Sequence, residues 1–298
     1  MNDDEKDFSF GGNRFFGQKT VQALIQKGYL VTIANRGLRS DDFGDNVNRI
    51  KVDRTDPTSS GWQEISQSYW DVVIDNICYT KEEAQIAIDY LTGKVGQYIF
   101  TSSLSVYEGE QIGFSETDFR PDTFIIDPAS ELNYSEGKRQ AEATFLAASD
   151  FPVAILRIPI VLDDDDYTER LHYYIRKIRN EETILVRDLS AQMSFIKGSE
   201  VAKVMLWLID INFKGIINAS SKEIISMNEL MNWIEEVVKV EPLVIESDQD
   251  ENQSPFSVEK DWYLDCQKMS ELGYPLPDLS SWLVPLIRRL NEKMAMNA

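Results

Sequence analysis

The sequence predicts an α/β protein: a Rossmann-type, doubly wound parallel sheet with a smaller C-terminal substrate lobe. Three observations predict it. In the first 160 residues, short apolar runs alternate with longer helix-like stretches, which is typical of βαβ units. A glycine-rich segment stands between the first apolar run and the first helical pattern, as in a dinucleotide-binding turn. After the fifth apolar run, a tyrosine and a lysine are spaced one helical turn apart.

The dinucleotide-binding domain is expected to span residues 1–160. Its predicted strands cover residues 8–10, 29–34, 50–52, 72–75, 98–101 and 153–157. Its predicted helices cover residues 20–27, 60–67, 81–91 and 134–147. The first strand alternates polar and apolar residues, whereas a central parallel strand should be nearly all apolar. We therefore expect this strand to be short and frayed, or the terminus to be altered.

Residues 161–298 are expected to form mostly the substrate-binding lobe, with segments at about 183–220 returning to the main domain. Helices are predicted at 168–178, 199–210, 227–238 and 280–294. Strands are predicted at 183–186 and 243–246, and the segment 215–219 is expected to rejoin the main sheet.

The amino-acid composition excludes several classes of protein. The 298 residues are 43% hydrophobic, but no apolar run is long enough to span a bilayer and the first residues do not form a signal peptide. We therefore expect a cytoplasmic protein. The net charge of −20 opposes nucleic acid or an anionic membrane as a partner. Cys78, Cys266 and the single histidine, His172, predict no disulfide framework, no Cys/His catalytic pair and no histidine-based zinc site. The acidic run 163–166 could bind a cation, but we expect a solvated loop and no metal site.

Residues 11–17, Gly-Gly-Asn-Arg-Phe-Phe-Gly, predict the cofactor turn. Gly11 would form the tight turn, and Gly17 would let the following helix pack closely on the sheet. Arg14 replaces the usual middle glycine, and its charge could contact a phosphate. The cofactor-binding residues expected here are Gly11, Asn13, Arg14, Phe15, Phe16 and Gly17. The alternative is a glycine-rich turn that binds nothing.

The residues after the second predicted strand, Asn35 and Arg36, bear on cofactor choice. NAD sites usually carry an acidic residue there, but this chain has Arg36, which favours a 2′-phosphate and so NADP(H) over NAD(H). Asp53 and Arg54 follow the third strand and would line the adenine pocket. Alternatively, Arg36 faces solvent and the other two residues cap a loop.

Tyr134 and Lys138 lie at positions i and i+4 of a predicted helix, so their side chains share a face. A neighbouring ammonium lowers the pKa of a phenol and makes it a better proton donor and acceptor near neutral pH. Ser103 stands at the end of a predicted buried strand, where its hydroxyl could bond a substrate oxygen. These three residue types suit redox chemistry between an alcohol and a carbonyl. Alternatively, Tyr134 and Lys138 simply lie on the surface of a helix and have no catalytic role.

Together these motifs resemble the short-chain dehydrogenase/reductase superfamily, in its extended and atypical branch of NAD-dependent epimerase/dehydratase-like proteins. The resemblance covers residues 8 to about 160 well. It implies that Tyr134 is the catalytic acid/base, and that Lys138 binds the nicotinamide ribose and lowers the pKa of the tyrosine. It implies that Ser103 pairs with the substrate oxygen and that Asn76 lines the cofactor cleft.

The resemblance implies an NAD(P)-dependent oxidoreductase or epimerase acting on a sugar nucleotide or a small carbonyl or alcohol. Similar 4,6-dehydratases carry Thr-Asp-Glu after the fifth strand, whereas this chain has Ser103, Leu104 and Ser105. Leucine transfers no proton, so dehydration is disfavoured. One alternative is a non-catalytic dinucleotide-binding sensor or regulatory protein, suggested by Arg14 and the polar first strand. RNA binding, known for some atypical relatives, is opposed by the net charge.

In the substrate lobe, Arg170, His172 and Trp262 are candidates to line a substrate pocket, together with Ser102 of the main domain. If the substrate is a sugar nucleotide, its pyrophosphate needs cations, and Arg157, Arg170 and Arg176 are the candidates. A homodimer is the usual expectation for a soluble enzyme.

Overall fold

A computed structural model describes residues 6–110, 112–247 and 254–296. The chain divides into two units, which are described separately here. The first contains the described residues of Met1–Glu108, Glu116–Ile158 and Ser199–Ala219, and the second contains those of Gly109–Ser115, Pro159–Gly198 and Ser220–Ala298. Residues 199–219 thus belong with the N-terminal part of the chain, whereas residues 183–198 belong to the second unit.

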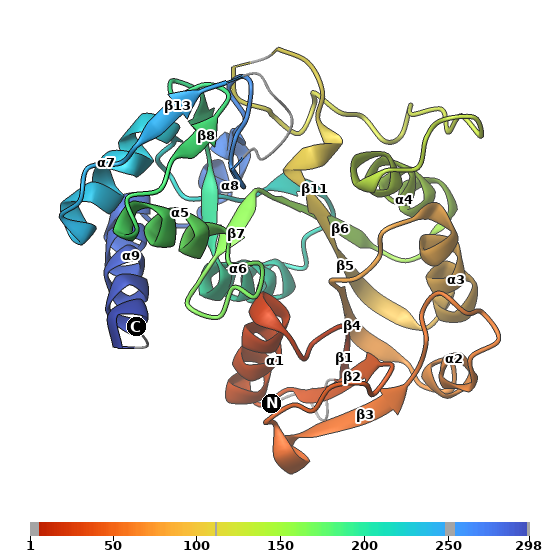
Figure 1. Ribbon diagram of the computed structural model, residues 1–298. Coiled ribbons are helices and arrows are strands. Elements are labelled where there is room, and N and C mark those ends of the chain that lie inside the picture. The colour runs from red at the N-terminus through yellow and green to blue at the C-terminus, as the bar shows by residue number, and fades with distance from the viewer. Residues whose placement is uncertain (1–5, 111, 248–253, 297–298) are drawn as a thin grey trace. The chain divides into compact units, whose positions relative to one another are not determined.

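A seven-stranded parallel sheet forms the centre of the first unit (Figure 1). Its strands are β1 (Lys6–Phe10), β2 (Leu30–Asn35), β3 (Val47–Lys51), β4 (Trp70–Asp75), β5 (Val95–Ser103), β6 (Val153–Ile158) and β11 (Gly215–Asn218). They lie in the order β11-β6-β5-β4-β1-β2-β3, with every neighbouring pair parallel. The predicted Rossmann-type fold is confirmed. Its strand order reverses between β1 and β4, where open α/β sheets bind ligands.

Helices cover both faces of this sheet (Figure 1). On one face lie α1 (Phe15–Lys27) and α6 (Gly198–Asp210), and on the other lie α2 (Ser60–Ile65), α3 (Lys81–Leu91) and α4 (Tyr134–Ala148). Short 3₁₀ helices occur at η1 (Gly44–Asn46) and η2 (Leu104–Val106). A 3.0 Å hydrogen bond from Gln97 in β5 to the Leu208 carbonyl ties α6 to the sheet. Helix α3 has the predicted bounds, whereas α1 begins five residues before the predicted position.

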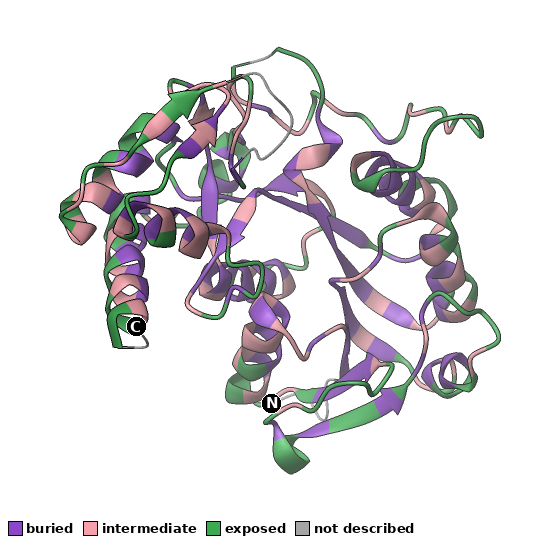
Figure 2. Ribbon diagram, viewed as in Figure 1, coloured by how far each residue is buried: buried purple, intermediate pink, exposed green. Residues whose placement is uncertain are grey.

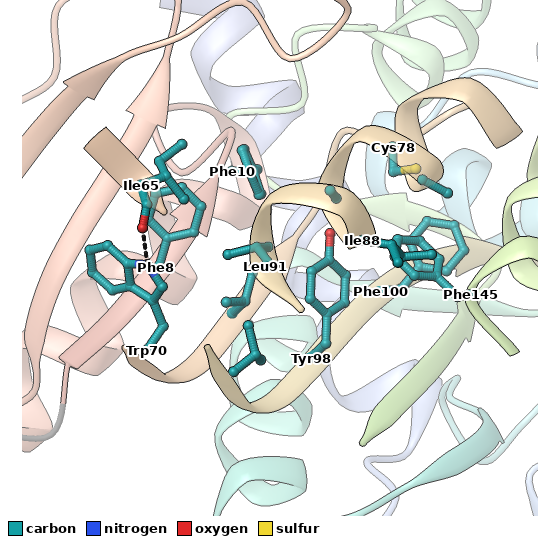
Figure 3. Close-up of a cluster of buried hydrophobic side chains, with 14 of the residues drawn as sticks. Phe8, Phe10, Ile65, Trp70, Cys78, Ile88, Leu91, Tyr98, Phe100 and Phe145 are labelled. Carbon is teal, nitrogen blue, oxygen red and sulfur yellow. Dashed lines mark hydrogen bonds between the residues drawn. The ribbon is translucent and has the colours of Figure 1, made fainter. Parts of the chain in front are cut away.

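The polar and apolar residues that alternate along β1 lie on opposite faces of the sheet, and both faces are buried. The strand is not frayed. β1 pairs with β2 along its five residues and with β4 on its other side. Phe8 and Phe10 are fully buried on one face, and their rings lie 4.5 Å apart in an edge-to-face arrangement. They belong to the hydrophobic cluster under α2 and α3, where Trp70 donates to the carbonyl of Ile65 (Figure 3). Burial of this aromatic face fixes the register of the strand.

The second unit has its own hydrophobic core, formed largely by α5 (Arg170–Arg179), α7 (Met227–Val238) and α9 (Leu279–Met296). Three two-stranded sheets complete it: β7 (Ile160–Leu162) with β10 (Phe195–Lys197), β9 (Gln192–Met193) with β12 (Ile225–Ser226), and β8 (Ile184–Val186) with β13 (Val244–Glu246). The short helix α8 (Gln267–Glu271) precedes α9. The predictions missed α8 and the strands of two or three residues at β7, β9, β10 and β12, because such short elements carry little periodicity.

Buried residues are concentrated along the strands of the main sheet and on the helix faces that cover it (Figure 2). Within the described ranges, no helix combines the length and the apolar character that a membrane crossing requires.

Candidate functional site

The glycine-rich turn after β1 leaves no room for side chains at its two ends. Gly11 has a φ of +77°, and a Cβ there would lie 2.6 Å from the side chain of Ile77. A Cβ on Gly17 would lie 2.9 Å from the carbonyl oxygen of Gly11. Glycine is therefore needed at both positions, first for the turn and then for the close approach of α1.

The first turn of α1 is not capped by the side chain of its N-cap residue. Arg14 occupies the N-cap position but makes no capping hydrogen bond with its side chain, and the first turn contains no acidic residue. Phe15, at the first helical position, has a φ of +51°, and its ring lies 5.7 Å from that of Phe16. Asn13 donates to the carbonyl of Arg39 at 3.4 Å, joining this turn to the loop after β2. Helix N-terminal amides without a side-chain cap are a favourable place for phosphate.

The residues after β2 and β3 differ in exposure. Arg36 is exposed, and Asp53 is half-buried. Hydrogen bonds from the hydroxyl and amide of Thr55 hold the pKa of Asp53 below its usual range, and the charge of Arg36 acts in the same direction. Arg36 and Asp53 are therefore neighbours at the ends of adjacent strands.

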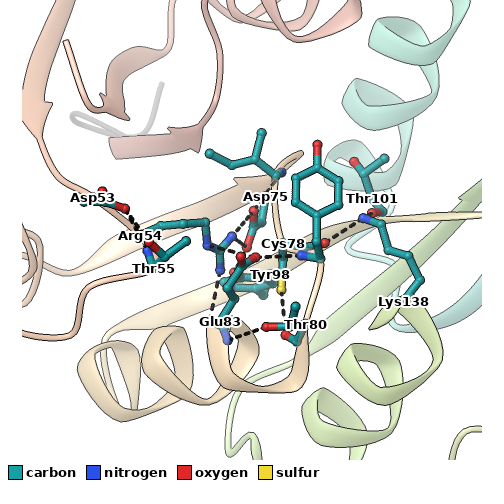
Figure 4. A network of polar contacts seen from close by, with 12 residues as sticks. Asp53, Arg54, Thr55, Asp75, Cys78, Thr80, Glu83, Tyr98, Thr101 and Lys138 are labelled. Atoms are coloured by element: carbon teal, nitrogen blue, oxygen red, sulfur yellow. Dashed lines mark hydrogen bonds and ion pairs between the residues drawn. The ribbon is translucent and has the colours of Figure 1, made fainter. Parts of the chain in front are cut away.

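Arg54 points into the first unit (Figure 4). Its Nη1 lies 2.6 Å from both carboxylate oxygens of Asp75, and its Nη2 donates to the carbonyl of Glu83 at 3.1 Å. The Asp75 carboxylate also accepts from the hydroxyl of Tyr98 at 2.5 Å. The guanidinium is thus held in a buried network, which contradicts the expectation that Arg54 lines the adenine pocket. Of the two residues, Asp53 is the one that reaches the surface.

Asn76 follows β4 and lies beside the glycine-rich turn. Its Oδ1 accepts from the hydroxyl of Thr101 at 2.7 Å. Its Nδ2 lies 3.4 Å from the point that a Cβ on Gly17 would occupy. This Nδ2 is buried and has no hydrogen-bond partner among the described residues. An unmatched buried donor costs about 1–3 kcal/mol, so the geometry fits a ligand acceptor at this position.

Lys138 is almost fully buried, with 2% of the residue exposed. Its Nζ donates to the carbonyl oxygens of Cys78 and Thr101, both at 2.7 Å. The ammonium also lies 4.7 Å from the ring centre of Tyr79 and 5.9 Å from that of Tyr134. Burial lowers the pKa of Lys138 to about 8, whereas the carbonyls and aromatic rings favour the charged form.

Tyr134 is the first residue of α4, and 53% of it is exposed. The helix begins there because the side chain of Asn133 caps it, accepting from the amide of Glu136 at 2.9 Å. Gly137 then brings the helix against the backbone, since a Cβ at this position would overlap the carbonyl oxygen of Tyr79. This close approach lets the next residue, Lys138, reach the ends of β4 and β5.

The serines at the end of β5 lie in different environments. Ser103 is half-buried, and its Oγ accepts from the amide and the hydroxyl of Ser105, at 3.1 and 2.9 Å. Ser102 is buried and donates to the carboxylate of Glu142. Ser103 therefore stands nearer the surface than Ser102.

The prediction that Arg157 could serve a pyrophosphate is wrong, because this residue has no exposed surface. Its guanidinium binds both carboxylate oxygens of Glu142, at 3.0 and 2.5 Å. It also donates to the hydroxyl of Tyr107 at 2.8 Å and to the carbonyls of Glu116 and Phe119. Arg157 thus holds the segment after β5 to β6.

The other candidates lie in the second unit. Arg170 donates to the Thr168 hydroxyl at 2.8 Å and to a backbone carbonyl at 3.1 Å. The ring of Trp262 packs edge-to-face on Phe114 at 5.5 Å. His172 is half-buried, and burial lowers its pKa.

Sequence reasoning missed the backbone and core groups that hold the site. The carbonyls of Cys78 and Thr101 carry no sequence signal, because any residue supplies a carbonyl. Asp75, a carboxylate at the end of an apolar strand, was a visible signal of a buried partner. Gly137, directly before Lys138, was a visible signal of close packing.

No protein-family model matches the sequence, and no curated protein sequence is similar to it. Solved structures do match the fold. UDP-glucose 4-epimerase from Thermotoga maritima, solved with UDP-glucose, is 17% identical, with 98% of this chain and 99% of that chain covered and a TM-score of 0.73. UDP-glucose 4-epimerase from Thermus thermophilus, solved with NAD, is 15% identical, with 97% and 99% covered and a TM-score of 0.71.

UDP-N-acetylglucosamine 4-epimerase from Methanobrevibacter ruminantium, solved with UDP-N-acetylmuramic acid, is 17% identical, with 99% of each chain covered and a TM-score of 0.71. The chain therefore has the fold of the NAD-dependent epimerases. This is the fold that the resemblance to the extended short-chain dehydrogenase/reductases implies, and the structural match extends over nearly the whole chain.

Proposed function

We propose that the protein is an NAD(P)-dependent oxidoreductase or epimerase that exchanges hydride with an alcohol or carbonyl carbon of a sugar-nucleotide-like substrate. The observation that carries this proposal is the place of Lys138. Two backbone carbonyls, one in the turn after β4 and one in β5, hold its ammonium beside the ring of Tyr134. This is the edge of the sheet at which doubly wound proteins bind dinucleotides.

The residues present fit a dinucleotide. The first turn of α1, which Arg14 does not cap, and the closely packed glycines suit a pyrophosphate, and the unmatched amide of Asn76 suits an acceptor on the same ligand. The proposed holding residues are Gly11, Asn13, Arg14, Phe15, Phe16, Gly17, Asn76 and Lys138, with Arg36 and Asp53 near the adenosine end. A bound nicotinamide dinucleotide would supply the hydride donor or acceptor.

In this proposal Tyr134 gives or takes the proton at its phenolic oxygen. Lys138 remains mainly protonated at neutral pH, because its pKa is lowered only to about 8. Its charge stabilises the phenolate and so makes Tyr134 effective near neutral pH. Ser103, half-buried at the end of β5, bonds the substrate oxygen.

The choice between the two dinucleotides rests on Arg36. The compared epimerase from Thermus thermophilus was solved with NAD. In this chain the position after β2 carries an exposed arginine and no acid, which supports a preference for a 2′-phosphate. We expect Arg36→Ala to weaken NADPH binding and leave NADH binding nearly unchanged, as measured by calorimetric titration. Equal affinities in the unaltered protein would contradict the preference.

The substrate class rests on two of the compared epimerases, those from Thermotoga maritima and Methanobrevibacter ruminantium, which were solved with UDP-linked sugars. Leu104, which stands where dehydratases are expected to carry an acid, is 3% exposed and offers no proton. We therefore propose epimerisation or simple redox chemistry in place of dehydration. Arg170 and Trp262 remain proposed substrate contacts of the second unit.

The direct test is a thermal-shift titration with NAD, NADH, NADP and NADPH, followed by incubation with UDP-sugars and product analysis. A ligand that binds only the folded state raises the melting temperature. The absence of a shift with all four dinucleotides would refute the proposal. Binding without turnover would favour the second candidate, a dinucleotide sensor, which the replacement of the middle glycine by Arg14 suggests.

A further inference from the structure

The segment between β4 and α3, residues 76–80, lies beside Lys138 and is called the 76–80 turn (Figure 4). The carbonyl of Cys78 accepts from Lys138, and the ring of Tyr79 lies 4.7 Å from the same ammonium. Helix α4 contacts this turn so closely that Gly137 has no space for a Cβ. The position of the turn therefore determines where the lysine ammonium is held.

Arg54 and Asp75 fix the beginning of the turn. The carboxylate of Asp75 accepts from the amide of Ile77 at 3.1 Å. Arg54 holds that carboxylate through Nη1 and the carbonyl of Glu83 through Nη2. The side chains of Arg54 and Asp75 are 5% and 0% exposed, so the pair is well shielded from water. A charged pair at this depth is rigid, because neither partner can be left alone without a large cost.

Glu83 fixes the far end of the turn. Its carboxylate accepts from the amide of Tyr79 at 2.7 Å, while the hydroxyl of Thr80 accepts from the amide of Glu83 at 3.3 Å. The amides on either side of Cys78, those of Ile77 and Tyr79, are therefore both held by carboxylates. The carbonyl between them is aimed at Lys138.

We propose that Arg54 and Glu83 are positioning residues, which hold the 76–80 turn so that the Cys78 carbonyl fixes Lys138 beside Tyr134. This inference rests on the proposed function for its consequence in catalysis. The restraint of the Lys138 side chain can be measured whether or not the protein turns over a substrate. Neither residue touches the reacting atoms in this proposal.

The test compares two substitutions at one position. Glu83→Gln keeps an oxygen that can accept from the Tyr79 amide but removes the charge, whereas Glu83→Ala removes both. The protein is produced with lysine labelled with ¹³C at Cε, and the Lys138 signal is identified by its loss in Lys138→Met. Its chemical shift is then followed from pH 6 to pH 11 in each variant.

We expect Glu83→Ala to move the midpoint of the Lys138 titration upward by about one pH unit, because a released lysine reaches water and regains its ordinary pKa. Glu83→Gln should leave the midpoint in place. Unchanged midpoints in both variants would overturn the proposal, and so would equal shifts, which would show a charge effect and no positioning. Arg54→Lys, which keeps the charge but loses the bond to the Glu83 carbonyl, should shift the midpoint in the same direction.

A control separates positioning from general loss of stability. Gln97 is buried in β5 and donates to the carbonyls of Leu208 and Phe213, neither of which belongs to the 76–80 turn. Gln97→Met should lower stability without moving the Lys138 midpoint. Dinucleotide thermal shifts are recorded on the same samples. If the unaltered protein binds no dinucleotide, the proposed function fails, while the Lys138 midpoints still decide the positioning.

Discussion

Lys138 and Asn76 are joined through a single residue: the ammonium donates to the carbonyl of Thr101 at 2.7 Å, and the hydroxyl of Thr101 donates to Asn76 at 2.7 Å. Thr101, near the end of β5, therefore holds both the lysine of α4 and the asparagine beside the glycine-rich turn.

This relationship predicts the effect of Thr101→Val, which keeps the carbonyl and removes only the hydroxyl. The Asn76 amide then loses its fixed orientation, and we expect dinucleotide affinity to fall several-fold with a loss of stability of about 1 kcal/mol. Calorimetric titration and urea unfolding would measure the two effects. Unaltered affinity would show that the orientation of Asn76 does not matter for binding.

Tyr134→Phe should abolish turnover and leave dinucleotide affinity nearly unchanged, because the substitution removes only the group that moves the proton. Tyr79→Phe is the matched control, since its ring lies 4.7 Å from the same Lys138 ammonium. That variant should keep activity within about tenfold. Retained activity in Tyr134→Phe would refute the mechanism.

The buried lysine predicts two pH dependences. The folded protein loses the Lys138 proton at a pKa of about 8, below its ordinary value of 10.5. Between these values the unfolded chain binds more protons, so the free energy of unfolding should rise with pH relative to Lys138→Met. Activity should fall above about pH 8, as the charge that supports Tyr134 disappears. Urea unfolding of the unaltered protein and of Lys138→Met at pH 7 and pH 10 would measure the stability difference, and a pH–rate profile would measure activity. A stability difference that is the same at both pH values would contradict the prediction.

Gly137→Ala should be severely destabilising, since the added methyl group overlaps the carbonyl oxygen of Tyr79 and must displace α4. A loss of about 2 kcal/mol or more is expected, as for other overpacked sites. Ser135→Ala, two residues earlier in the same helical turn, should change stability by less than about 0.5 kcal/mol. Equal stabilities of the two variants would show that the helix can move away freely.

The buried pair of Arg157 and Glu142 predicts strong non-additivity. Arg157→Met alone leaves Glu142 without its partner in a site with no solvent exposure, and should cost about 3–5 kcal/mol. Adding Glu142→Gln should restore part of that loss. For comparison, Lys27→Ala breaks an exposed pair with Asp210 and should cost less than about 1 kcal/mol. Strictly additive losses at positions 142 and 157 would contradict this interpretation.

The sequence was sufficient for the fold because the signals of βαβ units are local. The six predicted N-terminal strands and α3 were located from apolar runs and helical periodicity. The start of α1 was misplaced, because Gly17 interrupts the helical pattern for a reason of packing. The spacing of Tyr134 and Lys138 was informative since i and i+4 share a face.

The sequence could not show which polar side chains pair with one another inside the protein. Arg54 and Arg157 look like free loop and strand cations in the sequence, but each is paired with a carboxylate distant in the chain, Asp75 and Glu142. Such pairing depends on tertiary packing between elements and has no local pattern. The same is true of the two carbonyls that hold Lys138.

The last strand of the main sheet, β11, has a consequence for synthesis on the ribosome. It pairs with β6 but is made about sixty residues later, which is several seconds at ordinary translation rates. During that interval β6 has no partner strand on the side that β11 later occupies, and α6 does not yet cover its face of the sheet. A nascent chain of this length exposes a hydrophobic strand edge, so chaperone binding should be strongest in this window and decline once residue 218 has emerged.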